Sequence, residues 1–334
     1  MDAQGNVQSN DTSTNGTANE SEPATPTDAP FPFNSPHADV ILRSSDGMNF
    51  RVRKAILAEA SPFFETMFSL PTGTEQSTEK THAPDLPVVP MPEDSTVVVG
   101  LLQFCYPAGR QLQEMTLDDI VGVLPAARKY TMDRMVEYVT PLLQRFVATS
   151  SLRVYCLAIR FQLGEDLTRA AARGFLDHPI QVAYSHITEL DYISGAAYAR
   201  LLDYHNRCSF HVQQLFVRYY TGIDSAWDER CWHQCNFESK KNCTYRSFEN
   251  SQRVTVWFSG LMVRCRNLAK DRPSSREFSL QSTIAKALVE AGKCTFCGPR
   301  AWGDLQVFLP LLTTRIDGAI SQISLDVVAE ALSA

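Results

Sequence analysis

The sequence lacks any segment suited to a lipid bilayer. No run approaches the ~20 consecutive apolar residues that cross a membrane as a helix. The first residues also lack the basic start and apolar stretch of a secretory signal peptide. We therefore expect a protein of the cytoplasm, the nucleus or both, with no membrane partner, where glutathione keeps most thiols reduced.

Catalytic motifs are absent as well. The sequence contains no G-x-S-x-G nucleophile elbow, no phosphate-binding P-loop and no dinucleotide glycine fingerprint. No H-E-x-x-H or H-x-E signature stands near the cysteines to supply a catalytic base. The seven histidines have no convergent partner, so we interpret them as surface or core residues. These absences predict a protein that is not an enzyme.

Residues 1–30 lack basic side chains and have almost nothing to bury. They are rich in Asn, Thr, Ser, Gly and Pro, and their acids are Asp2, Asp11, Glu20, Glu22 and Asp28. Such a segment cannot offset the entropy lost on ordering, so we expect a disordered acidic tail. The whole chain has a formal net charge of −6, which does not favour nucleic acid or an anionic membrane as a partner.

A β-hairpin is the first element that the sequence predicts. Residues 38–43 form a short apolar run, and Asp46-Gly47 supplies a turn that tolerates positive φ. In the return strand Phe50 and Val52 alternate with polar residues, as in a strand with one buried face. A third strand is expected at residues 87–91, and its flanking prolines place it at the edge of a sheet.

Helices follow the strands. Ser61-Pro62 matches a helix N-cap with proline at the first helical position. Thr116 and Asp119 have the spacing of a capping box, in which each residue binds the backbone N–H of the other. Strands followed by a run of helices indicate an α+β unit.

Three blocks of this region resemble the BTB/POZ family, in the order and at the spacing found there. The blocks are Asp39-Val40 through Phe63-Phe64 and Met67-Phe68, then Leu101-Leu102-Gln103-Phe104-Cys105-Tyr106-Pro107, then Leu124-Pro125-Ala126-Ala127-Arg128-Lys129-Tyr130. The resemblance covers residues 37–149 and implies the BTB/POZ fold, a small β-sheet capped by a helical cluster. The overall layout is similar to BTB-domain proteins of filamentous and mushroom-forming fungi.

BTB/POZ domains bind proteins, so the resemblance implies an adaptor that self-associates, as in a homodimer, or recruits a partner. A cullin scaffold is one such partner, and the chain would then be a substrate adaptor of a ubiquitin ligase. Cullin-binding members carry a hydrophobic-x-acid triplet near the start of a helix, which residues 112–114 and 117–119 fit loosely, although the second triplet also fits a helix cap. The residues that the resemblance implies for partner binding are Asp39, Lys54, Leu112, Glu114, Leu117 and Asp118.

The sequence departs from the family in three places, one of which is a polar loop at residues 69–84 that is longer than most at this position. Val52-Arg53 stands where the family has Ala-His. Because the tail is expected to be disordered almost to Phe31, we also expect the chain to lack the extra N-terminal strand and helix that many BTB dimers exchange.

Residues 150–334 predict a mainly α-helical C-terminal region. A helix with an apolar stripe runs from Leu152 to Leu163, and Gly164 fits its C-cap. Further helices are expected at residues 165–176 and 192–215. Short connections favour antiparallel packing of these helices.

Cysteines become dense in the last third of the chain. Cys231, Cys235, Cys294 and Cys297 form two short-spaced pairs that could supply the four ligands of tetrahedral zinc, with His233 or Cys243 as substitutes. The first pair is spaced by three residues rather than two, and about 60 residues separate the pairs, more than in a compact zinc ribbon. Reduced buried thiols, redox chemistry and a disulfide remain alternatives to a zinc clip.

A basic stretch precedes Ser279 and interleaves with aromatic residues. Its cations include Arg264, Arg266, Lys270 and Arg272. This pattern is compatible with a nucleic-acid surface, and hence with a zinc-containing transcriptional regulator as an alternative to the adaptor. Because acids are mixed in, we favour a solvated face with ordinary core aromatics.

Overall fold

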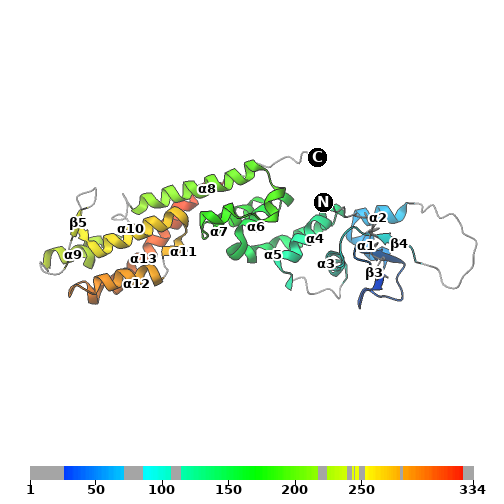
Figure 1. The fold of residues 1–334 in the computed structure, drawn as a ribbon, viewed down its shortest axis with the longest axis horizontal. Coiled ribbons are helices and arrows are strands. Elements are labelled where there is room, and N and C mark those ends of the chain that lie inside the picture. Colours follow the sequence, from blue (N-terminus) through cyan, green and yellow to red (C-terminus); the bar gives the residue numbers. More distant parts are fainter. Residues whose placement is uncertain are drawn as a thin grey trace, which may run out of the picture. The chain divides into compact units, whose positions relative to one another are not determined.

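The structure, a computed structural model, describes residues 26–70, 86–106, 114–216, 224–238, 243, 245–247, 253–278 and 281–325 (Figure 1). The chain divides into two compact units, residues 1–109 (unit 1) and residues 110–334 (unit 2), and we describe each by itself. None of the described helices is long and apolar enough to cross a membrane.

A mixed four-stranded sheet lies at the centre of unit 1. Its strands, in spatial order, are β1 (Thr27–Asp28), β3 (Met48–Val52), β2 (Val40–Arg43) and β4 (Val88–Pro90). The predicted hairpin is confirmed: β2 and β3 pair antiparallel, and Gly47 in the turn has a φ of 85° that suits glycine. The predicted edge position of the third strand is also confirmed, because β4 pairs only with β2 among the described strands.

Strand β1 lies within residues 1–30, which the sequence predicts to be a disordered tail that adds no strand. Thr27 N donates to the carbonyl of Gly47 at 3.2 Å, and Ala29 N donates to that of Asn49 at 2.9 Å. These bonds use backbone groups, so composition alone gives no sign of them. Residues 1–25 of the expected tail lie outside the described residues.

The helices in the described part of unit 1 are α1 (Lys54–Ala60), α2 (Pro62–Ser69) and α3 (Ser95–Cys105). Ser61 Oγ accepts a bond from Phe64 N at 3.2 Å, which confirms the predicted N-cap of α2. The sheet and helices enclose an apolar core, of which Val40, Leu42, Phe50, Val52 and Leu57 are fully buried members.

Helices make up most of unit 2. The first group is α4 (Leu117–Lys129), α5 (Asp133–Leu143), η2 (Gln144–Phe146), α6 (Val147–Phe161), α7 (Glu165–Phe175), η3 (Ile180–Tyr184), η4 (Thr188–Tyr192) and α8 (Gly195–Gln214). The predicted capping box is confirmed at the start of α4, where Asp119 N donates to Thr116 Oγ1 at 3.2 Å and Thr116 N donates to Asp119 Oδ2 at 2.9 Å.

The predicted C-cap at Gly164 is wrong. Helix α6 ends at Phe161, and Gln162 takes the left-handed conformation of the C-cap with a φ of 51°. Gly164, with a φ of 99°, stands at the N-cap of α7 instead. The three-residue connection therefore uses both a left-handed cap and a glycine, and the sequence pattern located only the glycine.

The distal part of unit 2 contains the cysteines. Its elements are η7 (Trp227–Glu229), α9 (Cys231–Glu238), β5 (Tyr245–Ser247), β6 (Arg253–Thr255), α10 (Val256–Asp271), α11 (Ser275–Phe278), α12 (Gln281–Ala291) and α13 (Gly298–Ser321). Strands β5 and β6 pair antiparallel, and α10 packs against both α8 and α12 (Figure 1).

Candidate metal centre

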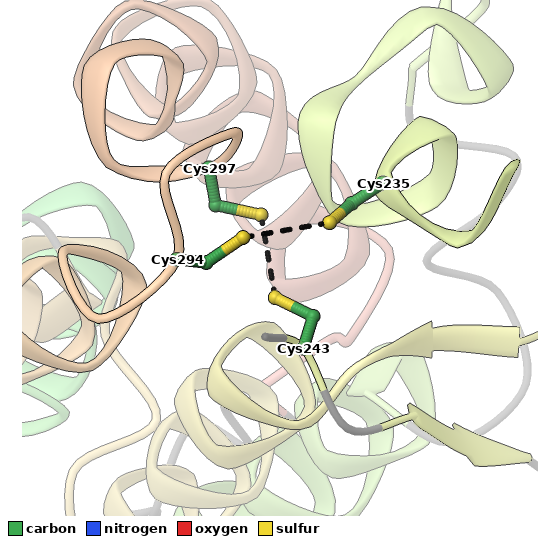
Figure 2. A group of neighbouring side chains, drawn as sticks. All are labelled: Cys235, Cys243, Cys294 and Cys297. Carbon is green, nitrogen blue, oxygen red and sulfur yellow. Dashed lines mark hydrogen bonds between the residues drawn. The ribbon is translucent and has the colours of Figure 1, made fainter. Parts of the chain in front are cut away.

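Four cysteine side chains converge in the distal part of unit 2. Cys235 comes from α9, Cys243 precedes β5, and Cys294 and Cys297 lie in the connection between α12 and α13 (Figure 2). All four sulfurs lie within 4.8 Å of one another. The Cys235–Cys294 sulfurs are 3.6 Å apart and the Cys243–Cys297 sulfurs are 3.7 Å apart. We call these four residues the thiol cluster.

The α12–α13 connection is tight enough to turn two cysteines toward one point. Cys294 N donates to the carbonyl of Ala291 at 3.0 Å, and Gly298 N donates to that of Cys294 at 2.8 Å. Gly298 packs closely on Gly292, since a Cβ at residue 298 would lie 3.4 Å from the Gly292 Cα. These backbone contacts make the connection tight, and the sulfurs of Cys294 and Cys297 both point to the centre of the cluster (Figure 2).

Helix α9 is fixed against α13 by charged groups at its first turn. The backbone N–H of Cys231 donates to Asp304 Oδ2 at 2.8 Å. Arg230 bonds Asp224 Oδ2 through Nε at 2.6 Å and lies 3.6 Å from Asp304 Oδ1 through a second nitrogen. A carboxylate at a helix N-terminus also suits the positive end of the helix dipole. These contacts anchor the start of the helix that carries Cys235 one turn later.

Aromatic rings close the surroundings of α9. Trp232 stacks on Phe258 with ring centroids 4.3 Å apart, and it meets Trp257 and Phe308 edge-on. Three of the clustered cysteines are buried, and Cys243 is partly exposed. The cluster therefore lies in a largely water-excluded region, where an isolated thiolate is costly.

The electrostatics of the cluster permit one thiolate more readily than several. The pKa of Cys297 is lowered to about 5, and the largest cause is a hydrogen bond with the Cys231 thiol. The buried indole N–H of Trp257 also favours the Cys297 thiolate and so lowers its pKa. Burial raises the pKa of Cys243, and the bond to Cys297 raises that of Cys231. Four thiolates at this spacing would require a cation among them.

The cluster differs at one position from the quartet that the sequence indicated. Cys235, Cys294 and Cys297 are together as expected, but Cys243, named only as a substitute, takes the place of Cys231. Cys231 lies about 6 Å before Cys235 along the axis of α9, with its carbonyl oxygen 3.7 Å from Cys297 Sγ. His233, the other substitute, faces Asp228 with Nδ1 3.7 Å from Oδ1.

Several residues that the resemblance implied for partner binding have local roles in the fold. Asp39 Oδ1 accepts a bond from the N–H of Lys54 at 2.7 Å, and Lys54 Nζ lies 5.6 Å from the centre of the Phe68 ring. Leu117 is buried. Asp118 is 82% exposed and pairs with Arg153 at 2.7 Å.

The structure describes all of the expected cullin triplet at residues 117–119 but only the last residue of the one at residues 112–114. Glu114 is exposed, whereas Leu112 lies outside the described residues. In the second triplet Leu117 faces the core and Asp119 belongs to the capping box, so Asp118 is its accessible acid.

Comparison with known proteins assigns the N-terminal part of the chain. No curated protein matches the sequence. Residues 33–146 match the family model of the BTB/POZ domain, close to the range that the sequence resemblance covered. The small mixed sheet and the following helices agree with the α+β architecture of that fold. Residues 33–146 therefore constitute a BTB/POZ domain, a class of domain that mediates protein–protein interactions.

Proposed function

We propose that this protein is a non-enzymatic adaptor, which binds a second copy of itself or another protein through its BTB/POZ domain. The match of residues 33–146 to the BTB/POZ family carries this proposal. The helical region from about residue 150 onward would then be the part that the domain brings to its partner. The proposed boundaries are a tail at residues 1–30, the domain at residues 37–149 and the helical region at residues 150–334.

The surface of unit 1 supports an interaction role. Phe31 is 81% exposed, and Phe63 and Val88 are also exposed. Val88 stands in the edge strand β4, whose outer backbone groups can pair with another chain. Removing such apolar side chains from water on binding yields about 25 cal/mol per Å² of buried apolar area.

The test compares self-association and partner recovery for matched variants of the full chain. Light scattering after size exclusion gives the mass of the protein over a concentration series. Quantitative affinity purification gives the proteins that co-purify. The variant Phe31→Ser/Phe63→Ser should lower dimer content or recovery, whereas Val289→Ser, which removes an exposed side chain from α12 in unit 2, should not. A chain that stays monomeric, and whose co-purifying proteins are the same for both variants, contradicts the proposal.

A cullin scaffold is the partner whose contact residues can be tested most directly. Glu114 and Asp118 are exposed and so are accessible to a partner. If a cullin co-purifies, Glu114→Ala and Asp118→Ala should reduce its recovery. Recovery that both substitutions leave unchanged would assign the contact to another surface.

A further inference from the structure

We propose that Cys235, Cys243, Cys294 and Cys297 bind one Zn²⁺ in a closed tetrahedral site that stabilises the distal part of unit 2. This inference does not depend on the proposed adaptor function. It rests on the convergence of four sulfurs, on the enclosure of the cluster and on the short elements that the cluster connects.

The spacing of the sulfurs fits shared coordination. With zinc–sulfur bonds of ~2.3 Å, the sulfurs of a regular tetrahedron lie ~3.8 Å apart. The Cys235–Cys294 and Cys243–Cys297 sulfurs are 3.6 and 3.7 Å apart, and the other sulfur pairs are all within 4.8 Å. A disulfide would require ~2.05 Å. Two neighbouring thiols can also touch at such distances, but the meeting of four sulfurs at one point indicates shared coordination.

The composition of the cluster selects the metal and the kind of site. Four thiolates form a soft, tetrahedral ligand set, which is typical of zinc or iron in proteins. With four protein ligands, no coordination position remains for water or substrate, so the site is structural rather than catalytic. No histidine or carboxylate belongs to the cluster among the described residues.

The elements around the cluster are too short to be stable alone. Strands β5 and β6 have three residues each, and α9 has eight. An isolated two-stranded hairpin and a helix of this length are marginal in water. The sulfurs connect α9 and Cys243 to the α12–α13 connection across sequence separations of 59 and 54 residues. A bound ion would therefore supply cross-links that these elements lack.

The test measures the metal content of the purified full chain directly. The zinc content measured by mass spectrometry should approach about one ion per chain, as a single closed four-thiolate site requires. Replacement of zinc by Co²⁺ should give intense visible bands of tetrahedral cobalt and strong sulfur-to-cobalt charge transfer. Both measurements use the unsubstituted protein, so neither depends on the folding of a variant.

Three serine variants then identify the ligands. Cys243→Ser changes the least buried member of the cluster and should abolish stoichiometric zinc binding and the cobalt bands. Cys231→Ser, which alters the residue outside the cluster, should retain both, and so should Cys105→Ser in unit 1. If the Cys243→Ser variant does not fold, the unsubstituted protein provides the test instead. After its metal is removed with a chelator, added zinc should restore its fold.

Several results would overturn the proposal. These are a protein that takes up no zinc after chelation and refolding, a stoichiometric iron centre, and a disulfide within the cluster found by mass spectrometry. Loss of zinc in Cys231→Ser with retention in Cys243→Ser would replace this quartet by the one that sequence spacing suggested. A protein that binds zinc but stays monomeric, and whose co-purifying proteins are the same for both unit 1 and control variants, would contradict the adaptor function alone.

Discussion

The sheet of unit 1 and the thiol cluster of unit 2 bring distant residues together by different chemistry. In unit 1, apolar side chains of β2, β3 and α1 are buried at one core, and Phe50 and Val52 are fully enclosed. In the distal part of unit 2, the side chains that meet at one point are thiols from three segments. Apolar burial is non-directional and tolerates small shifts. A tetrahedral site requires all four ligands at fixed distances.

The two regions should therefore lose stability in different ways when they are perturbed. An apolar core loses stability in proportion to the atoms removed and the cavity left behind. A metal site fails as a whole, because its binding free energy is part of the folding free energy of the elements it joins. We therefore expect graded responses in unit 1 and an all-or-none response around the thiol cluster.

Removal of zinc should have the largest effect. Structural zinc in small peptides contributes about 10–16 kcal/mol of apparent binding free energy. Treatment with a strong chelator should therefore unfold α9, β5 and β6. Hydrogen exchange should rise sharply there and at the α12–α13 connection, while the amides of β2 and β3 stay protected. If the amides of β2 and β3 lost protection from exchange as much as those around the thiol cluster, the two regions would not be stabilised independently.

Truncation of the unit 1 core should come next. Phe50 is fully buried and contacts Phe33 edge-on at 6.1 Å between ring centroids. Phe50→Ala should lower the free energy of unfolding by about 3–5 kcal/mol, the usual cost of such a cavity. Chemical denaturation followed by circular dichroism measures this change, and zinc content should not change. Phe31→Ala, at an exposed position, serves as the control and should change stability by less than about 0.5 kcal/mol.

The same contrast explains what the sequence could predict. Alternation in β3 and the Asp46-Gly47 turn are local patterns, so they predict the hairpin correctly. The prolines that flank β4 are also local and predict its edge position. The Thr116 capping box is likewise local. Cys243 was the weaker candidate because its spacing to Cys235 follows no standard zinc motif, and only the folded chain brings the two together. Strand β1 could not be predicted, because its pairing depends on backbone groups.

The capping box allows a test at the level of one helix terminus. Thr116→Ala removes the side chain that accepts from Asp119 N, so it should cost about 1 kcal/mol of stability. Asp118→Ala removes a solvent-exposed ion pair with Arg153 and should cost less than the cap. Denaturation of both variants gives the comparison. If Asp118→Ala cost more than Thr116→Ala, the start of α4 would depend on the ion pair rather than on the cap.

The smallest effect should be the acid sensitivity of the hairpin turn in unit 1. Asp46 accepts bonds from Ser95 N at 2.9 Å and Ser95 Oγ at 2.6 Å, which join the β2–β3 turn to the start of α3. Hydrogen bonds from Ser44 and then from Ser95 hold the pKa of Asp46 below its usual value. The ionised carboxylate is thus favoured in the folded state. Its stabilising contribution is complete above the unfolded pKa of about 3.9 and is lost as pH falls through the lower folded value.

Asp46→Asn tests whether this contribution comes from the charge. Because the carboxylate is exposed, the variant should be only slightly less stable than the original protein at neutral pH. The difference should shrink as the pH falls below about 4, where the original carboxylate becomes neutral. The amide NMR signal of Ser95 reports the same titration, since its N–H donates to Asp46. A stability difference that stays constant across this range would assign the effect to hydrogen-bond geometry, and the turn would then respond to acid no more than the apolar core beneath it.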